Sequence, residues 1–460
     1  MEEALLEALD VGMKLGASLV EARGEKTVKT RITVKDGRIE VAREGFESGI
    51  GVRVLAKGAW GYASTSNVDS TSAGRAAEEA FKLASSIGEE IRSPVRLAEV
   101  KPERVKLRWG VKVHPSKVPI EEKASLTLGL NRSLLEADGR IRSCTVEYLD
   151  LSSLQYVYTS EGARVLQEKV YVWLRVTLSA YEAGVYATAS EEAGASLGFE
   201  YFEEARIEAL KRRLVDRVKG QLEAVAAKGG AYPAVLGPSV VGVFAHESLG
   251  HMAEADLALS GSILLDQAGR QVASNHVTIY DDGGLEGSFG YSPYDDEGVR
   301  ARRVAILEQG RVTGFLHNRE TAGRLEAEPT GNARAENFRY TPIVRMRNTF
   351  MAPGDHSLEE LFEPVRFGYY LKALRGGQTN MDGTFQVGVQ EAYEIVKGEV
   401  GRPVRNLSIA GNTLETLMEV EAVGRDFELW PGRCGKGQTA FISDGGPTIR
   451  VRSLRIGGRD

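Results

Sequence analysis

Hydrophobic and polar residues change their spacing several times along the chain, and each change predicts a different kind of element. Residues 2–16 carry apolar side chains at helical spacing, whereas residues 19–64 alternate through KDGRIEVA to GIGVRVLAKGAWGYAS, which predicts β-hairpins. Further helices are predicted over about residues 71–87 and 120–137, and strands in YLDLSSLQYVYTS and KVYVWLRVTLSAY. This order is typical of an α+β protein rather than of regular βαβ winding.

The second half of the chain has a different pattern. A charge-rich amphipathic segment over about residues 202–227 predicts a long connecting helix. After it, GG, DG and GN pairs separate short strand-like runs, and residues 358–362 form one of few helical windows. We therefore predict an α+β fold of two domains. Residues 1–228 form an N-terminal domain of helices and antiparallel strands, and residues 229–460 form a β-rich domain that carries the metal-site helix described below.

Composition excludes several classes of protein. The chain has 460 residues, 42% hydrophobic and 27% charged, which is the normal range for a globular protein. Its net charge is -6 with both signs mixed along the chain, so we expect no nucleic-acid partner. The N-terminus MEEALLEALD lacks the basic start of a signal peptide, and no apolar run approaches the ~20 residues of a membrane span. We predict a cytoplasmic protein without a membrane partner.

The stretch HESLGHMAEAD, residues 246–256, resembles the zinc-peptidase pattern H-E-x-x-H with one additional residue. In a regular helix, side chains five positions apart point roughly 140° away from each other, so His246 and His251 would not share a metal ion. A π-bulge, in which one turn holds an extra residue, returns them to the same face. Gly250 lies where this distortion is needed, so we predict that the helix bends and that both imidazoles bind the metal.

A catalytic zinc ion usually has three protein ligands and a water, so one ligand is still missing. Cys434, in the glycine-rich loop GRCGKGQ, is the best candidate because a thiolate suits Zn²⁺. Glu254 and Asp256 compete for the same position. We favour a different role for these two carboxylates, in which they orient a ligating imidazole. Glu247 is the predicted catalytic residue, a general base for the water that attacks a peptide bond.

Other candidate residues have structural explanations. Cys144 lies in the strand-like run SCTVEYL and is expected to be a small buried hydrophobe. The remaining histidines lie in unrelated contexts and receive no role; they are His114, His276, His317 and His356. GKGQT is not a phosphate loop because Gly437, rather than Ser or Thr, follows Lys436. RGGQTNMDGT and GLEGSFG are interpreted as hairpin turns.

Two acidic, glycine-rich stretches, DDGGLEGSFG and YSPYDDEG, have two alternative interpretations. Solvated turns are the favoured one, since the regular spacing of a calcium-binding loop is absent, and a hard-cation site is the other. The residues concerned are Asp281, Asp282, Asp295, Asp296 and Glu297.

Several segments together resemble the TldD/PmbA family, also called modulators of DNA gyrase, and specifically its TldD-type subunit. They are HESLGH, YDDEGV, RYTPIVRMRNTF, RGGQTNMDGTF, GRPVRNLSIAGNT, GRCGKGQ and the terminal SLRIGG. The resemblance covers nearly the whole chain. It implies a cytoplasmic zinc metallopeptidase that cleaves small or unstructured polypeptides and works in a dimer, with a PmbA-type (TldE) partner that lacks the metal motif.

The resemblance also implies residue roles. His246, His251 and Cys434 match the metal ligands of the family, and Glu247 matches its catalytic glutamate. It further implies that substrate binds in a cleft as an added β-strand, which recognises backbone more than side chains. The alternative is a non-enzymatic subunit that binds or regulates polypeptides without cutting them. A binding subunit has no need of an intact metal and base set, so we favour the enzyme.

Overall fold

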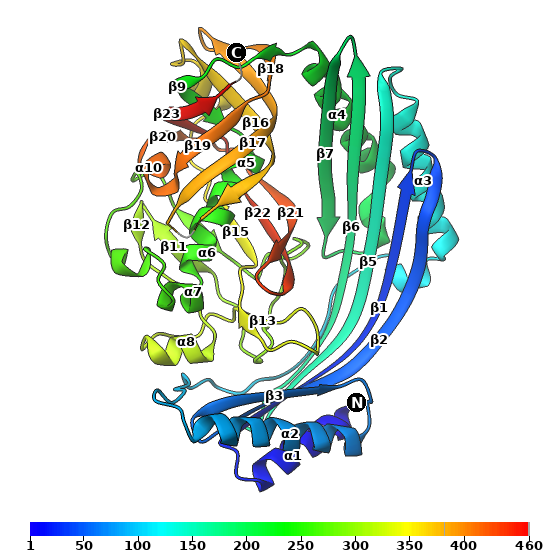
Figure 1. Cartoon of the computed structure of the whole chain (residues 1–460), viewed down its shortest axis with the longest axis vertical. Helices are drawn as coiled ribbons and strands as arrows, with labels where there is room; N and C mark the ends of the chain where they lie inside the picture. The colour runs from blue at the N-terminus through cyan, green and yellow to red at the C-terminus, as the bar shows by residue number, and fades with distance from the viewer. Residues whose placement is uncertain (381, 459–460) are drawn as a thin grey trace.

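The computed structural model describes residues 1–380 and 382–458. Its N-terminal half is built on one long, curved sheet with the order β3-β2-β1-β5-β6-β4, in which β7 also pairs with β6 (Figure 1). All pairings are antiparallel except that between β4 and β6. The strands are β1 (Leu19–Lys35), β2 (Arg38–Ala56), β3 (Ala59–Thr65), β4 (Arg104–Arg108), β5 (Ile141–Thr159), β6 (Arg164–Glu182) and β7 (Val185–Ala195).

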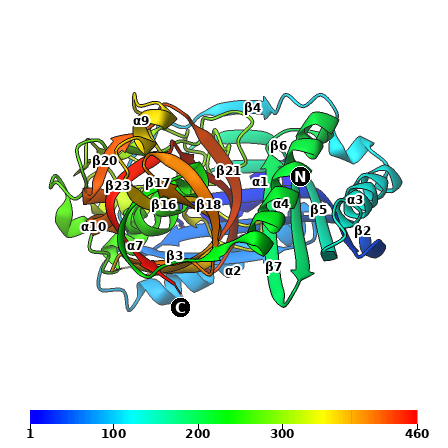
Figure 2. The ribbon, with the colours of Figure 1, turned by 90° about the horizontal axis from the view of Figure 1, so that it is seen from above.

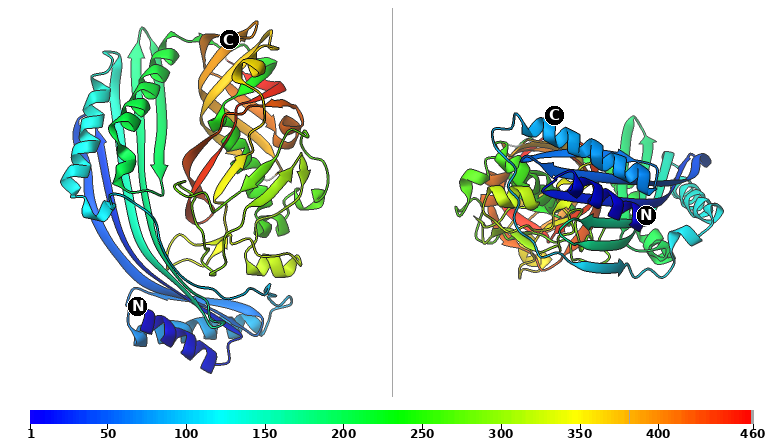
Figure 3. Two further views of the ribbon diagram at one scale, coloured as in Figure 1. Left: turned by 180° about the vertical axis from the view of Figure 1, so that it is seen from behind. Right: turned by 90° about the horizontal axis from the view of Figure 1, so that it is seen from below.

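Alternation along the strands decides which face each side chain joins. Val20 and Ile32 of β1 are fully buried under helices at opposite ends of the sheet. Residues at the alternate positions of β1 point to the opposite face of the sheet, toward the C-terminal half. Arg23 is one of them and lies 3.8 Å from Asp296. The covering helices (Figure 3, blue and cyan to green) are α1 (Glu2–Lys14), α2 (Ser70–Gly88), α3 (Ile120–Leu135) and α4 (Glu204–Glu223). All four predicted helices and the predicted strands of this half are confirmed.

The C-terminal half contains an eight-stranded sheet that closes on itself, since β16 pairs with both β9 and β17 (Figure 2). Its order is β16-β9-β23-β19-β17-β18-β8, with β20 paired to β23. The hairpin predicted in RGGQTNMDGT joins β16 to β17, and residue 381 of this stretch is outside the described residues. The strands are β8 (Val225–Ala226), β9 (Gly230–Leu236), β16 (Phe367–Thr379), β17 (Thr384–Val396), β18 (Glu399–Arg405), β19 (Ser408–Asn412), β20 (Val420–Val423) and β23 (Ile449–Gly457).

A six-stranded sheet of order β12-β11-β10-β15-β22-β21 lies beside it. Its hairpin β21–β22 extends into the space between the closed sheet and the long sheet (Figure 1). The strands are β10 (Ile279–Asp281), β11 (Val304–Glu308), β12 (Arg311–Val312), β15 (Asn348–Met351), β21 (Glu428–Gly435) and β22 (Thr439–Gly446), besides the separate pair β13 (Ala333–Arg334) and β14 (Ile343–Val344).

The helix of the histidine motif starts inside the core of this half. Gly237 precedes α5 (Pro238–Val243), and Pro238 stands at the helix start, where a missing N–H costs nothing, as predicted. Val240, Val241 and Leu249 are fully buried in the C-terminal core. The helix ends earlier than predicted, because Glu254 leaves the helical conformation with ψ 113. The other helices are α6 (His251–Ala253), α7 (Ala255–Leu259), α8 (Arg319–Arg324), α9 (Leu358–Phe362) and α10 (Thr413–Met418); α9 was predicted.

The acidic turns of this half are buried, so the prediction that they are solvated is wrong. Asp281 accepts hydrogen bonds from the backbone N–H (2.8 Å) and Nε (3.2 Å) of Arg347. Asp295 accepts two from the backbone of its own turn, which replace water as hydrogen-bond donors. The exposed fraction is 7% or less for Asp281, Asp282, Asp295, Asp296 and Glu297.

Two of these acids join the halves of the molecule. The Arg53 guanidinium donates to Glu21 of the long sheet at 2.7 Å and to Glu297 of the C-terminal half at 2.6 Å. Gln155 Nε2 donates to Asp296 Oδ1 at 2.7 Å. No helix among the described residues is long and apolar enough to cross a membrane.

Candidate metal centre

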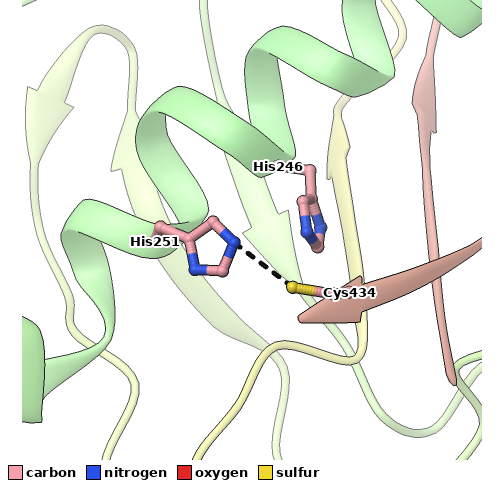
Figure 4. Close-up of side chains that lie close together, drawn as sticks. All are labelled: His246, His251 and Cys434. Atoms are coloured by element: carbon pink, nitrogen blue, oxygen red, sulfur yellow. Dashed lines mark hydrogen bonds between the residues drawn. The ribbon is translucent and has the colours of Figure 1, made fainter. Parts of the chain in front are cut away.

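The histidine motif contains a π-type turn over Phe244–Gly250, which follows α5 directly. The backbone N–H of His251 donates to the carbonyl of His246, five residues earlier. This wide turn brings the two imidazole centroids to 5.2 Å, and both rings lie on the same side of the helix (Figure 4). The predicted π-bulge is therefore confirmed.

Glycine at position 250 serves close packing, whereas the sequence predicted that it allows the helix to bend. Its backbone is regular helix, with φ -58 and ψ -49, so the bend does not require a glycine conformation. A Cβ at this position would lie 2.0 Å from Met346 Sδ and 3.3 Å from the carbonyl of Ala245. Glycine therefore allows the wide turn to pack closely against Met346.

Cys434 reaches the two imidazoles from the end of β21 (Figure 4). Its Sγ lies 3.2 Å from His251 Nε2, and the ligand atoms of His246, His251 and Cys434 all lie within 4.8 Å of one another. Arg345 holds the hairpin in place, because its guanidinium donates to the carbonyls of Cys434 (2.6 Å) and Gln438 (2.7 Å). Nothing in the sequence pattern predicted this contribution of Arg345.

The three side chains fit a zinc ion. Two imidazole nitrogens and a thiolate are the donor types that Zn²⁺ prefers, with bonds of about 2.0–2.3 Å. The buried Nδ1 of His246 has no hydrogen-bond partner among the described residues, as expected of a group arranged around an ion. No other group of three His, Cys, Asp or Glu side chains in the described part of the chain brings its ligand atoms together in this way.

Glu254 and Asp256 have different surroundings. Glu254 is fully buried, and its Oε2 lies 2.9 Å from His251 Nδ1, the position of a carboxylate that orients a ligand. Asp256 instead accepts a hydrogen bond from Lys436 Nζ at 2.7 Å, and the same ammonium lies 3.2 Å from Glu254. Asp256 is therefore linked to the imidazole indirectly, through Lys436 and Glu254.

The two histidines have opposite electrostatic environments. Burial, together with the nearby His251 and Arg345, holds the pKa of His246 well below its usual value, so this imidazole is neutral and can act as a ligand. Burial also lowers the pKa of His251, but hydrogen bonds to Cys434 and Glu254 outweigh it and raise the pKa to about 10. A bound cation would compete with the proton that this environment favours.

Glu247 lies between the imidazoles and an open cavity. Its carboxylate is 4.0 Å from the Nε2 atoms of both His246 and His251, and its side chain is 44% exposed. The cavity has a volume of about 580 Å³ and lies between the long sheet and the C-terminal half. Its lining includes Glu247, Trp430 and Asp444.

Asp444 is a second carboxylate beside Glu247 that the sequence pattern did not reveal. Burial, Glu247 and Glu192 raise the pKa of Asp444 to about 8. It lies opposite Trp430 in the β21–β22 hairpin, so only the pairing of these strands brings it to the cavity.

The other histidines lie outside this group. His317 is buried against Thr321, and His356 faces the carbonyl of Val423. His114 is near Ser116, and His276 belongs to an exposed turn. Cys144 is fully buried in the core of the N-terminal half, as predicted.

Comparison with known proteins covers the whole length of the fold. Residues 229–458 match the PmbA/TldA metallopeptidase C-terminal domain, residues 20–84 its domain 1 and residues 113–222 its central domain. A metalloprotease of Methanothermobacter thermautotrophicus is 39% identical over 93% of this chain and 92% of its own. The zinc metalloprotease TldD homolog of Saccharolobus solfataricus is 33% identical over 97% of this chain and 98% of its own.

Solved structures show the same fold at lower sequence identity. TldE from Thermococcus kodakarensis is 21% identical, with a TM-score of 0.80 over 99% of this chain and 100% of its own. A protein from Thermotoga maritima described as a putative modulator of a DNA gyrase is also 21% identical. Its TM-score is 0.81 over 99% of this chain and 100% of its own. With its three matched domains and its metalloprotease relatives, the chain belongs to the PmbA/TldD family of metallopeptidases.

Proposed function

We propose that this protein is a zinc-dependent peptidase that hydrolyses peptide bonds in small or unstructured polypeptides. The observation that carries the proposal is the convergence of two imidazoles and one thiol beside a glutamate that faces a cavity. A relative 33% identical to this chain is named a zinc metalloprotease, which supports zinc as the ion.

His246, His251 and Cys434 would hold the ion, and Glu254 would orient His251 through its Nδ1 atom. A zinc ion supplies Lewis-acid chemistry, which makes water a stronger nucleophile and polarises a peptide carbonyl. Arg345 and Lys436 would keep the thiol and the carboxylate in this arrangement through their contacts with Cys434 and Glu254.

Glu247 would act as general base. Its carboxylate would take a proton from the attacking water and then give it to the leaving amine, so that the peptide C–N bond breaks and a carboxylate and an amine are released. The side chain is partly exposed at the cavity, where a substrate can reach it. Backbone of β16 at Gly376 and Gly377 lines the same cavity and could pair with an extended peptide as an added strand.

The first experiment compares Glu247→Gln with the unchanged chain and with Glu308→Gln. Glu308 is an exposed acid of β11 outside the cavity, so its variant is a matched control. We expect Glu247→Gln to keep its zinc and to lose at least ~10²-fold in peptide hydrolysis, because general-base catalysis is worth about 10²–10⁴-fold. Unchanged turnover in Glu247→Gln would rule out Glu247 as the general base. Stoichiometric peptide binding without cleavage by the zinc-loaded chain would instead favour a binding subunit.

We also propose that the active form is a dimer, with a PmbA-type subunit as the heterologous partner. The TldE structure from Thermococcus kodakarensis supports a shared fold for such a pair. Light scattering of this chain, alone and after co-expression with a PmbA-type chain from the same genome, distinguishes monomer, homodimer and heterodimer.

A further inference from the structure

One carboxyl group in the cavity at Glu247 has no partner among the described residues. Four carboxylates of the described part of the chain line this cavity, those of Glu191, Glu192, Glu247 and Asp444. Glu191 lies 3.2 Å from the guanidinium of Arg217, and Glu192 accepts a hydrogen bond from Trp173 Nε1 at 2.9 Å. Asp444 accepts no hydrogen bond from, and forms no ion pair with, any residue that the structure describes. Its oxygens are therefore available to a substrate in the cavity.

The cations of this cavity are engaged elsewhere. Those that line it in the described structure are Arg175, Arg217, Lys372 and Arg375. Arg217 and Lys372 both pair with Glu391, at 2.7 and 2.8 Å. Arg175 lies 3.8 Å from Glu192. No ion pair between described residues joins any of the four to the unpartnered carboxyl, and the charges that act on it are both negative.

Asp444 lies against the helix that carries Glu247. A Cβ at Gly242 of α5 would lie 2.6 Å from Asp444 Oδ1 and 2.5 Å from the backbone nitrogen of Gly445. Glycine at this position therefore lets β22 approach the helix closely. The π-type turn that follows α5 places Glu247 at the same cavity, where Val243 adds apolar surface. The two carboxyl groups thus open into one space.

This environment keeps a proton on Asp444 near neutral pH. Burial, together with the negative charges of Glu247 and Glu192, raises the pKa of Asp444 to about 8. A carboxyl group buried without a hydrogen-bond donor costs stability, so the arrangement has no evident benefit for folding. Neighbouring carboxyl groups of which one is protonated and the other ionised are instead typical of an acid and a base that act in the same reaction.

We propose that Asp444 is the proton donor to the leaving amine in peptide hydrolysis, and that it passes on the proton that Glu247 takes from water. The proposal rests on the proposed function and adds a second catalytic residue to it. Glu247 takes a proton from the water whose oxygen bonds to the carbonyl carbon. Asp444 gives its own proton to the nitrogen as the C–N bond breaks, and Glu247 then returns a proton to Asp444. One water and one peptide bond thus give a carboxylic acid and an amine, and both residues regain their starting states.

The test compares Asp444→Asn with Asp266→Asn in the zinc-loaded chain. Asp266 is exposed in the short 3-10 helix Leu265–Gln267, outside the cavity, so its variant is a matched control. The probes are an unstructured peptide and the para-nitrophenyl ester of its N-terminal segment. An amine must gain a proton to leave, whereas para-nitrophenolate leaves as the anion. We expect Asp444→Asn to keep its zinc and to lose at least ~10²-fold in kcat for the peptide, with a much smaller loss for the ester.

The dependence of kcat on pH gives a second readout, which a purely structural role of Asp444 would not move. A proton donor works only while it is protonated, so kcat for the peptide should fall on the alkaline side as Asp444 loses its proton. The ester should lack this decline, and so should the residual peptide hydrolysis of Asp444→Asn. An alkaline decline of the same size for both substrates would belong to groups that both reactions share, and it would overturn the assignment.

The same assays separate this inference from the proposed function. Glu247→Gln should lose both activities, because the peptide and the ester both need an activated water. Peptide hydrolysis by Asp444→Asn at the rate of the unchanged chain would overturn the proton donor and leave the peptidase. A parallel loss of both activities in Asp444→Asn would also overturn it, since Asp444 would then serve only the shape of the site. Hydrolysis of neither substrate by the unchanged chain would remove the proposed function itself, and the proton donor with it.

Discussion

Cys434 and His251 are 183 positions apart in the chain, yet their Sγ and Nε2 atoms are 3.2 Å apart. The residue types are informative on their own: two histidines flank a glutamate, and the loop cysteine is a soft ligand. The choice among Cys434, Glu254 and Asp256 as third ligand stayed open on residue type alone. Their contacts differ, because Glu254 faces the far nitrogen of His251 and Asp256 faces Lys436.

The two cysteines offer a matched test of the third ligand. We expect Cys434→Ala to lose most of its bound zinc, because two imidazoles alone leave the ion short of protein ligands. Cys144→Ala removes a thiol that is fully buried in the N-terminal core, so it should keep its zinc while losing some stability. The zinc that each variant retains after dialysis is then measured. Equal zinc in the two variants would exclude Cys434 as a ligand.

Glu254→Gln tests whether this carboxylate orients His251. Glutamine can still accept a hydrogen bond from the imidazole but carries no charge, so we expect zinc affinity to fall about 10-fold or more, the usual cost of such a change. Asp256→Gln is the comparison and should have a smaller effect, because Asp256 contacts Lys436. Competition with a chromogenic chelator gives both affinities. A larger loss in the Asp256 variant would reverse the two assignments.

At the scale of elements, the period of the motif predicted the wide turn correctly, because the geometry of a helix depends on residues a few positions apart. The same reasoning missed the break at Glu254 and the helices α8 and α10, which are only six residues long. It also missed Asp444, whose position depends on the pairing of β21 with β22. Local spacing predicts an element well and predicts its neighbours across a sheet poorly.

The stability of the zinc-free chain should depend on pH through Asp444. Its pKa is raised from 3.8 to about 8, so between these values the folded state keeps a proton that the unfolded state releases. Stability from this group therefore falls as pH rises from about 4 to 8. We expect Asp444→Asn to raise the melting temperature of the zinc-free chain more at pH 8 than at pH 5. An equal shift at the two pH values would contradict the raised pKa.

At the scale of the whole molecule, the two halves meet through charges that the sequence pattern assigned to solvent. Asp296 and Glu297 are buried against the concave face of the long sheet, where Arg53 links Glu21 to Glu297. Buried ion pairs of this kind need close geometry to offset the loss of hydration. This interface also forms cavities with walls from both halves, among them the cavity at Glu247.

Arg53→Met should therefore destabilise the protein strongly. It would leave Glu21 and Glu297 buried side by side without the cation that pairs with both, at a cost of about 3 kcal/mol or more. The control is Lys57→Met, which breaks the exposed pair between Lys57 and Glu89 and should change stability little, because water screens an exposed pair. Urea denaturation measures the free energy of unfolding of each variant. Similar losses in both would mean that Arg53 is not needed at the interface.

The α+β class, the helices and strands of the N-terminal half, the π-type turn and the types of the candidate metal ligands could all be predicted from the amino-acid sequence. These follow from alternation, helical period and side-chain chemistry, which depend on neighbours close in the chain. Three features became evident from the three-dimensional packing alone: Glu254 rather than Asp256 contacts His251, the acidic turns are buried, and β1 and β2 lie beside the cysteine hairpin. Such contacts join residues far apart in sequence, and they depend on how whole sheets pack rather than on any local pattern.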